Sequence, residues 1–198
     1  MKNLNYPIDL TFKITTLSND FTAKDATGVT VAYVRQKMLK LIEEIQVFSN
    51  ENRSEAIYTI KANKWLDFNT TYTFINQMGN DTGRVVRKGW ASIWRAHYEI
   101  YDENQLQDLL ISEENPWVKV SDSMLDEIPF LGLLSGYLFH PSYSVSRPNG
   151  SLVARLKKQS SFFGRRFTIE KLGELKKGEE ERILLGLMMM ILLERRRG

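Results

Sequence analysis

The side chains that could do chemistry are few, and their spacing is not that of a catalytic site. The sequence has no cysteine, which excludes thiolate catalysis, disulfides and cysteine-bound metals. Its two histidines, His97 and His140, lack the short spacing to a second ligand that metal motifs show. Adjacent carboxylates, such as Glu113-Glu114, fall in charged stretches where solvation or helix capping explains them. The sequence also lacks a Gly-x-Ser-x-Gly turn and a glycine-rich phosphate loop. We therefore expect no enzymatic activity, no cofactor and no metal.

A group of basic residues near the C-terminus is the clearest functional signal. Residues 151–198 carry twelve Lys and Arg against six Asp and Glu, although the whole chain has a net charge of only +3. Five of these residues fall on a predicted hairpin with Phe162-Phe163 near its tip: Arg155, Lys157, Lys158, Arg165 and Arg166. Such a hairpin suits an anionic phospholipid surface, where each charge adds about 1 kcal/mol. The competing interpretation is an ordinary solvated hairpin whose phenylalanines pack inward.

A second candidate contact lies in an uncharged run at residues 128–139. Its apolar side chains Phe130, Leu131 and Leu134 could form an exposed patch for a protein partner or a membrane. Pro129 and two glycines exclude a membrane-spanning helix for this run. The alternative is a short helix or loop that caps one end of the fold.

Nucleic acid is not an expected partner. Residues 88–94 partly match an RNA-recognition strand, but Ser92 stands where that motif needs an aromatic side chain. The order of the predicted elements also lacks the interleaved helices of that fold. Trp90 and Trp94 are therefore interpreted as packing residues.

The elements that must position these residues are mostly short β-strands. Period-two alternation and turn signals predict eight strands before residue 103, at residues 10–17, 21–25, 29–34, 45–49, 56–62, 72–76, 84–88 and 93–101. Residues 72–100 then resemble residues 143–169, with Gly83 and Gly150 as the matching turn glycines. Such a duplication favours a closed sheet, because many short strands must lose their free edges.

One predicted helix, residues 179–196, has no polar face in its centre. Residues 183–193 are uncharged, with acids before them and three arginines after them. Eleven helical residues span roughly 16 Å, about half of the ~30 Å hydrocarbon layer. We therefore expect a buried helix that fills the barrel, and no transmembrane span. An integral lipid-scrambling protein anchored by this helix remains the alternative. The N-terminus lacks the apolar stretch of a signal peptide, which favours a cytoplasmic protein or one peripheral at the membrane.

Three further features carry a resemblance to a known superfamily, and they are residues 115–117 (Asn-Pro-Trp), residues 140–145 and the helix at 180–193. With the paired hairpins, they make the chain similar to tubby C-terminal-like domains, closest to bacterial LURP-one-related and phospholipid scramblase-like proteins. The resemblance implies a mainly β fold, a closed antiparallel barrel of about twelve strands from two related halves around a buried hydrophobic C-terminal helix. It also implies one domain over residues 1–198, with a first half at about 8–102, a connecting segment at 103–142 and a second half at 143–172.

Function in that superfamily includes phosphoinositide binding and calcium-dependent lipid movement. No residue set here matches the phosphoinositide site, and no Asp-x-Asp-x-Asp-Gly calcium loop is present. The sequence therefore predicts a non-enzymatic domain that binds a ligand or an anionic membrane surface. The alternatives are a protein-interaction or scaffold module and a scramblase-like lipid protein. The oligomeric state is not predicted.

Overall fold

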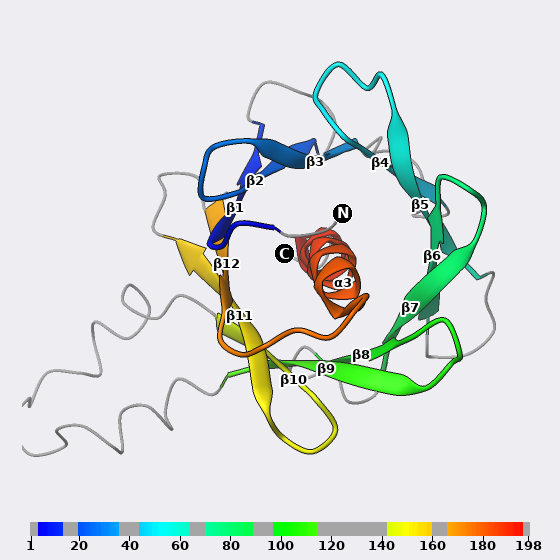
Figure 1. Ribbon diagram of the computed structural model, residues 1–198, viewed down its shortest axis with the longest axis vertical. Helices are drawn as coiled ribbons and strands as arrows, with labels where there is room; N and C mark the ends of the chain where they lie inside the picture. The colour runs from blue at the N-terminus through cyan, green and yellow to red at the C-terminus, as the bar shows by residue number, and fades with distance from the viewer. Residues whose placement is uncertain are drawn as a thin grey trace, which may run out of the picture.

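The chain folds into a closed antiparallel β-barrel around one helix (Figure 1). The structure, a computed structural model, describes residues 4–13, 20–35, 44–63, 70–88, 97–114, 142–159 and 166–195. Its elements are β1 (Ile8–Phe12), β2 (Phe21–Lys24), β3 (Thr30–Arg35), β4 (Glu44–Phe48), β5 (Ala56–Ala62), β6 (Thr70–Asn76), β7 (Asp81–Arg87), β8 (His97–Tyr101), β9 (Gln107–Glu113), β10 (Ser142–Ser146), β11 (Leu152–Gln159), β12 (Arg166–Lys171) and α3 (Glu179–Arg195). Each strand pairs with its sequence neighbour, and β1 pairs with β12 to close the ring. The predicted fold class is confirmed.

Alternation of side chains decides which face of each strand is buried. In β6, for example, Tyr72 and Phe74 are buried and the threonines on either side of Tyr72 are only partly covered. The same pattern recurs in β8, β9 and β10, so the inward side chains of the strands form one continuous core. The sequence periodicity predicted most of the strands, though not β9, because one face of an antiparallel sheet can remain in water.

Four hairpins at one end of the barrel share one turn. The residue at the first position of each turn donates its amide to the fifth residue and accepts from the amide of the fourth, in turns 25–29, 76–80, 102–106 and 147–151. The fourth residue has positive φ and is Gly28, Gly79, Gln105 or Gly150. The partner of Gly150 in the duplicated unit is therefore Gly79, and the match of Gly150 with Gly83 made from the sequence is wrong.

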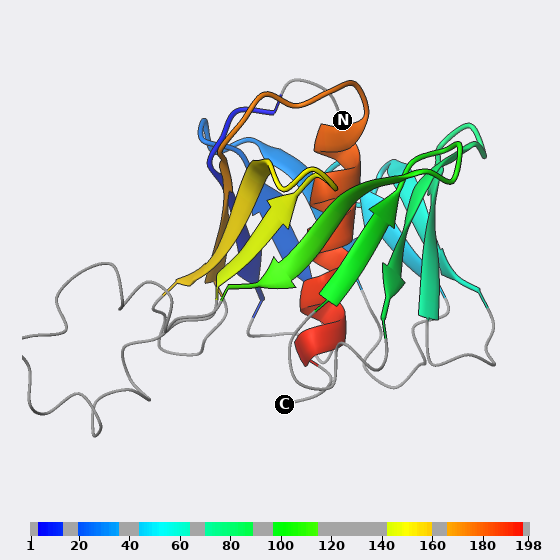
Figure 2. The ribbon, with the colours of Figure 1, turned by 90° about the horizontal axis from the view of Figure 1, so that it is seen from below.

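The helix α3 runs through the barrel along its axis (Figure 2). Residues from Ile183 to Leu192 other than Gly186 are each at most 2% exposed, so every side of the helix is covered by strands. The backbone of α3 comes closest to β7, β8 and β9. Among the described residues, no helix combines the length and apolar character needed to cross a bilayer. The expectation that this helix fills the barrel is confirmed.

The two ends of the barrel differ. One end holds the start of α3 together with residues 25–29, 49–55, 76–80, 102–106, 147–151 and 172–182, and we call it the N-terminal mouth (Figure 2). The opposite end holds the last turn of α3. There Tyr98 donates its hydroxyl to Oε1 of Glu194 at 2.5 Å, although Tyr98 is fully buried.

Candidate functional site

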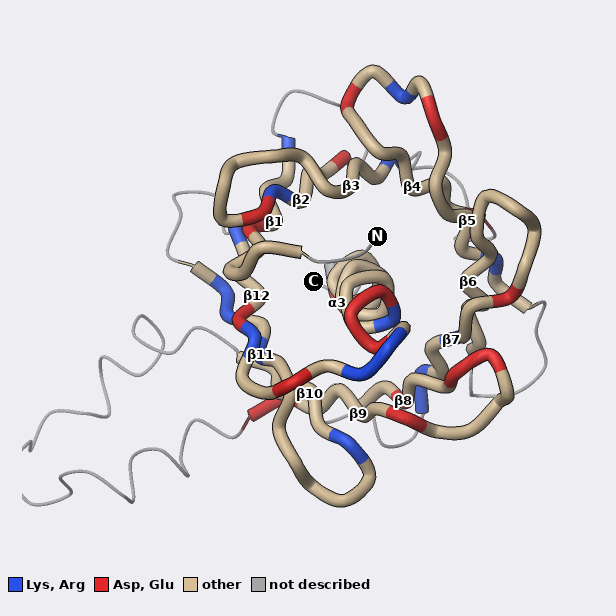
Figure 3. Tube along the Cα trace, in the orientation of Figure 1, with Lys and Arg blue, Asp and Glu red and all other residues tan. Residues whose placement is uncertain are grey.

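The predicted basic hairpin forms, and it consists of β11 and β12. Their register places Arg155 opposite Glu170, Lys157 opposite Thr168, Lys158 opposite Phe167 and Gln159 opposite Arg166. Figure 3 shows the blue positions of Lys and Arg along both strands. Arg165 and the Phe162-Phe163 pair lie outside the described residues, as do Phe130, Leu131 and Leu134 of the second candidate contact.

Two of the predicted residues are already paired with acids. The Nε of Arg155 lies 2.7 Å from Oε1 of Glu114 on the segment after β9. The Nζ of Lys157 lies 2.7 Å from Oε1 of Glu170, and both side chains remain about one third exposed or more. These partners offset much of the positive charge that the sequence indicated, and Arg155, at 23% exposure, has the less accessible side chain.

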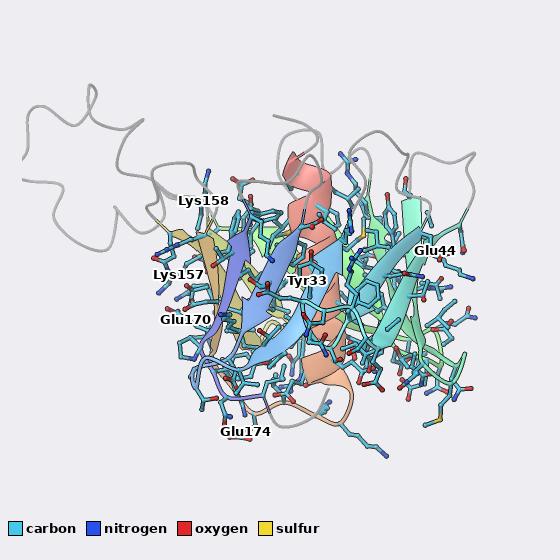
Figure 4. All side chains as sticks on the ribbon, turned by 90° about the horizontal axis from the view of Figure 1, so that it is seen from above. Tyr33, Glu44, Lys157, Lys158, Glu170 and Glu174 are labelled. Atoms are coloured by element: carbon cyan, nitrogen blue, oxygen red, sulfur yellow. The ribbon has the colours of Figure 1, made fainter. Side chains whose placement is uncertain are left out.

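Lys158 and Arg166 lie closer to the strand ends than the two paired residues. Lys158 follows the inward register of Ala154 and Leu156, but it lies near the end of β11 and is only partly buried. Figure 4 shows Lys158, Lys157, Glu170 and Glu174 in succession along this wall, toward the end where α3 begins. Arg166 begins β12 and is exposed.

A groove of about 320 Å³ lies beside Arg166 on the outer wall. Gln159 donates its Nε2 amide to Oγ1 of Thr168 at 3.0 Å, and Thr168 donates that hydroxyl to Oδ1 of Asp9 at 2.7 Å. The lining residues come from β1, β11 and β12 and are Asp9, Leu10, Thr11, Gln159, Arg166, Phe167 and Thr168. The Thr168 hydroxyl is committed to Asp9, so the donors left in this concave place are the Arg166 guanidinium, the second N–H of the Gln159 amide and the Thr11 hydroxyl, and these suit a phosphate or carboxylate group.

A larger cavity of about 500 Å³ opens at the N-terminal mouth. Arg182 of α3 reaches across it and donates Nε to Oδ2 of Asp108 at 2.9 Å and Nη1 to Oε2 of Glu103 at 3.1 Å. The stem of Arg182 passes so close to Gly83 that a Cβ there would lie 2.6 Å from its Cδ. Gly83 in β7 therefore makes room for this buried arginine.

A second ion pair stands beside the first in this cavity. Arg147 donates Nε and Nη2 to Glu179 at 2.9 and 2.7 Å. Burial acts to raise the pKa of Glu179, but hydrogen bonds from Arg147 and from the Lys176 amide outweigh it and hold the pKa below its usual range. At Asp108 burial prevails over Arg182, so its pKa is raised.

Sequence reasoning missed this cavity. Its side chains are dispersed over the β8–β9 turn, the β10–β11 turn and the entry to α3, and no short spacing connects them. The one available signal was Arg182, a charge placed directly against the apolar run of a helix predicted to be buried. Within the described ranges, no three His, Asp or Glu side chains are grouped as metal ligands.

The chain resembles proteins of a known family. The LURP-one-related family model matches residues 9–174. The X-ray structure of a protein from Arabidopsis thaliana is similar over 98% of this chain and 93% of that chain, at 10% identity and a TM-score of 0.49. No curated protein matches the chain. The LURP-one-related match confirms the resemblance that the sequence indicated. With most of its length matched by that model, the chain belongs to the LURP-one-related family.

Proposed function

We propose that this LURP-one-related domain binds anionic phospholipid headgroups at a membrane surface through the outer wall of β1, β12 and β11. The groove beside Arg166 is the observation that carries the proposal. It combines one exposed guanidinium with the second N–H of the Gln159 amide and the hydroxyl of Thr11. These are the donors that a phosphate group accepts from.

The charges next to the groove favour binding to a membrane surface over binding of one tightly held ligand. Lys157 lies on β11 next to the groove and pairs with Glu170 at the surface, whereas Lys158 follows the inward register of its strand. Two outward basic side chains, Arg166 and Lys157, contribute roughly 2 kcal/mol near an anionic bilayer, or about thirtyfold in partitioning. Asp9 lies in the groove and reduces this gain. The expected binding is therefore weak, additive and sensitive to salt.

Vesicle flotation tests the proposal. We expect the protein to float with phosphatidylcholine vesicles that contain phosphatidylserine, to float less in high salt, and to float little with phosphatidylcholine alone. Arg166→Glu should abolish most of the binding, whereas Lys61→Glu on the opposite wall, at β5, should not. Equal losses for the two variants, salt-insensitive flotation or no flotation at low salt would contradict the proposal.

Competition with inorganic phosphate distinguishes a lipid headgroup from a soluble anion as the ligand of the groove. If the groove holds a membrane phosphate, inorganic phosphate should displace the protein from vesicles more than chloride at the same ionic strength. Saturable phosphate binding that Arg166→Glu removes, without any flotation, would assign the groove to a soluble anion and overturn the membrane role. Thermal unfolding of each variant checks that the barrel is intact.

A further inference from the structure

Exposed apolar side chains gather at the N-terminal mouth. Among the described residues, every large apolar side chain that is exposed lies in or next to this mouth, and they are Val29, Met78, Leu106, Leu152 and Leu172. Single exposed apolar residues are normal on a protein surface, but they are usually scattered. Met78, Leu106, Leu152 and Leu172 all belong to the contiguous run of strands from β6 to β12. They lie on separate turns around more than half of the ring, and among them Leu106 is the one that lines a cavity.

The 500 Å³ cavity opens beside Leu106. Leu106, which is 66% exposed, and Pro148 form apolar parts of its wall. Its polar wall includes the Arg182–Asp108 and Arg147–Glu179 pairs. The cavity is concave and has both apolar and charged walls, so it suits a protruding side chain of a protein partner. A flat bilayer surface presents no such side chain.

The charge of the mouth decides which partner fits. The residues that form it include nine Asp and Glu against five Lys and Arg, a balance of −4, so the rest of the chain carries +7. The lining of the cavity itself is balanced at four acids and four bases, with Arg147 and Arg182 bound to carboxylates, so the excess negative charge comes from the surrounding residues of the mouth. Figure 3 shows red positions at the start of α3 and at the β8–β9 turn. An anionic bilayer or a nucleic acid would be repelled, whereas a cationic polypeptide would be attracted.

We propose that the N-terminal mouth docks a cationic segment of a partner protein, with apolar side chains on Leu106 and basic side chains toward Glu103. Glu103 is suited to this role because its side chain is 56% exposed although it also accepts from Arg182. This site lies away from the β1–β12–β11 groove and does not rest on the proposed membrane role.

A labelled peptide of alternating lysine and leucine is the probe, with a matched peptide of glutamate and leucine. We expect saturable binding of the basic peptide by fluorescence anisotropy, weakening with salt, and none of the acidic one. Leu106→Ser should lower the affinity at least about tenfold. Glu103→Gln should lower the affinity and reduce its dependence on salt.

Val29→Ser is the matched control. Val29 holds the fifth position of the β2–β3 turn, as Leu106 does in the equivalent β8–β9 turn, and it is 59% exposed. The ring order places these two turns on opposite sides of the barrel (Figure 1). Val29→Ser should leave peptide affinity within about twofold of the unmodified protein.

Three results would overturn the docking proposal. They are no saturable binding of the basic peptide, equal binding of the acidic peptide, and equal losses from Val29→Ser and Leu106→Ser. A fourth is capture of the protein by neutral phosphatidylcholine vesicles that Leu106→Ser prevents, because it would make the mouth a bilayer contact. Urea unfolding of Leu106→Ser should match the unmodified protein, so that lost binding reports the contact and not the fold.

Discussion

Gly186 sets how closely α3 approaches the wall formed by β8 and β9. A Cβ at this position would lie 2.7 Å from Cδ1 of Ile100 and 3.6 Å from Cδ1 of Ile111. Both isoleucines are fully buried, so they have little space in which to move. We expect Gly186→Ala to destabilise the protein by about 1 kcal/mol, since overpacking outweighs the better helix propensity of alanine.

A second substitution tests this explanation of Gly186. Ile100→Val removes the Cδ1 atom that the new methyl group would meet. Combined with Gly186→Ala, it should cost less than the sum of the two single changes, with a coupling of about 0.5 kcal/mol or more. Urea unfolding of the two single variants and the double variant measures this coupling. Additive free energies of unfolding would place the close contact elsewhere.

Arg182 is the other residue whose role follows from its surroundings. It is 6% exposed and holds Asp108 and Glu103. Arg182→Met would leave the mostly buried carboxylate of Asp108, 17% exposed, without its partner, which should cost about 3 kcal/mol at neutral pH. Lys157→Met breaks an exposed pair with Glu170 and should cost less than about 1 kcal/mol. Equal losses would show that burial does not set the value of these pairs.

The cost of Arg182→Met should depend on pH. Burial raises the pKa of Asp108, so the folded state holds this proton more tightly than the unfolded chain does. A raised carboxyl pKa makes folding more favourable as pH falls through it toward the ordinary value near 4. Loss of Arg182 raises the pKa further, so the deficit relative to the unmodified protein should be largest near neutral pH and shrink in acid. A deficit constant with pH would mean that Asp108 does not carry it.

At the scale of elements, α3 is the internal support of the barrel. Met189 is fully buried among strands, and its neighbours on every side of the helix are apolar. Met189→Leu conserves volume and polarity and should cost less than about 1.5 kcal/mol. Met189→Lys places an ammonium group in that core with no partner and should prevent soluble folding. Soluble expression and circular dichroism distinguish the two variants, and a folded Met189→Lys protein would contradict this role of α3.

The elements also show what the sequence could predict and what it could not. The strand at residues 56–62 was predicted at its observed bounds, because alternation there is uninterrupted. The strand β9 was missed, since the turn before it reaches positive φ with Gln105 where the equivalent turns use glycine. At that turn Asp102 accepts from the amides of Asn104 and Leu106 and so holds the loop without glycine. The ion pairs of the cavity were also missed, because Arg182 pairs with residues more than seventy positions away and Arg147 with one thirty-two positions away.

At the scale of the whole molecule, charge is unequally divided along the barrel. Within the described residues, the N-terminal mouth carries −4 and the other residues +3. A molecule with this polarity should turn its mouth away from an anionic bilayer, because the field orients it before any single contact forms. Membrane binding through the β1–β12–β11 wall and docking at the mouth are therefore compatible.

Orientation on vesicles can be measured directly, because the chain has no cysteine of its own. A single cysteine at Met78, which is 86% exposed at the mouth, should place a polarity-sensitive dye in water on vesicles containing phosphatidylserine. A cysteine at Thr11, in the groove beside Arg166, should give a dye whose emission shifts to the blue on the same vesicles. Raising the salt concentration should remove the shift, since screening shortens the reach of the charges. A blue shift at Met78 with none at Thr11 would reverse the orientation and refute the assignment of the two surfaces.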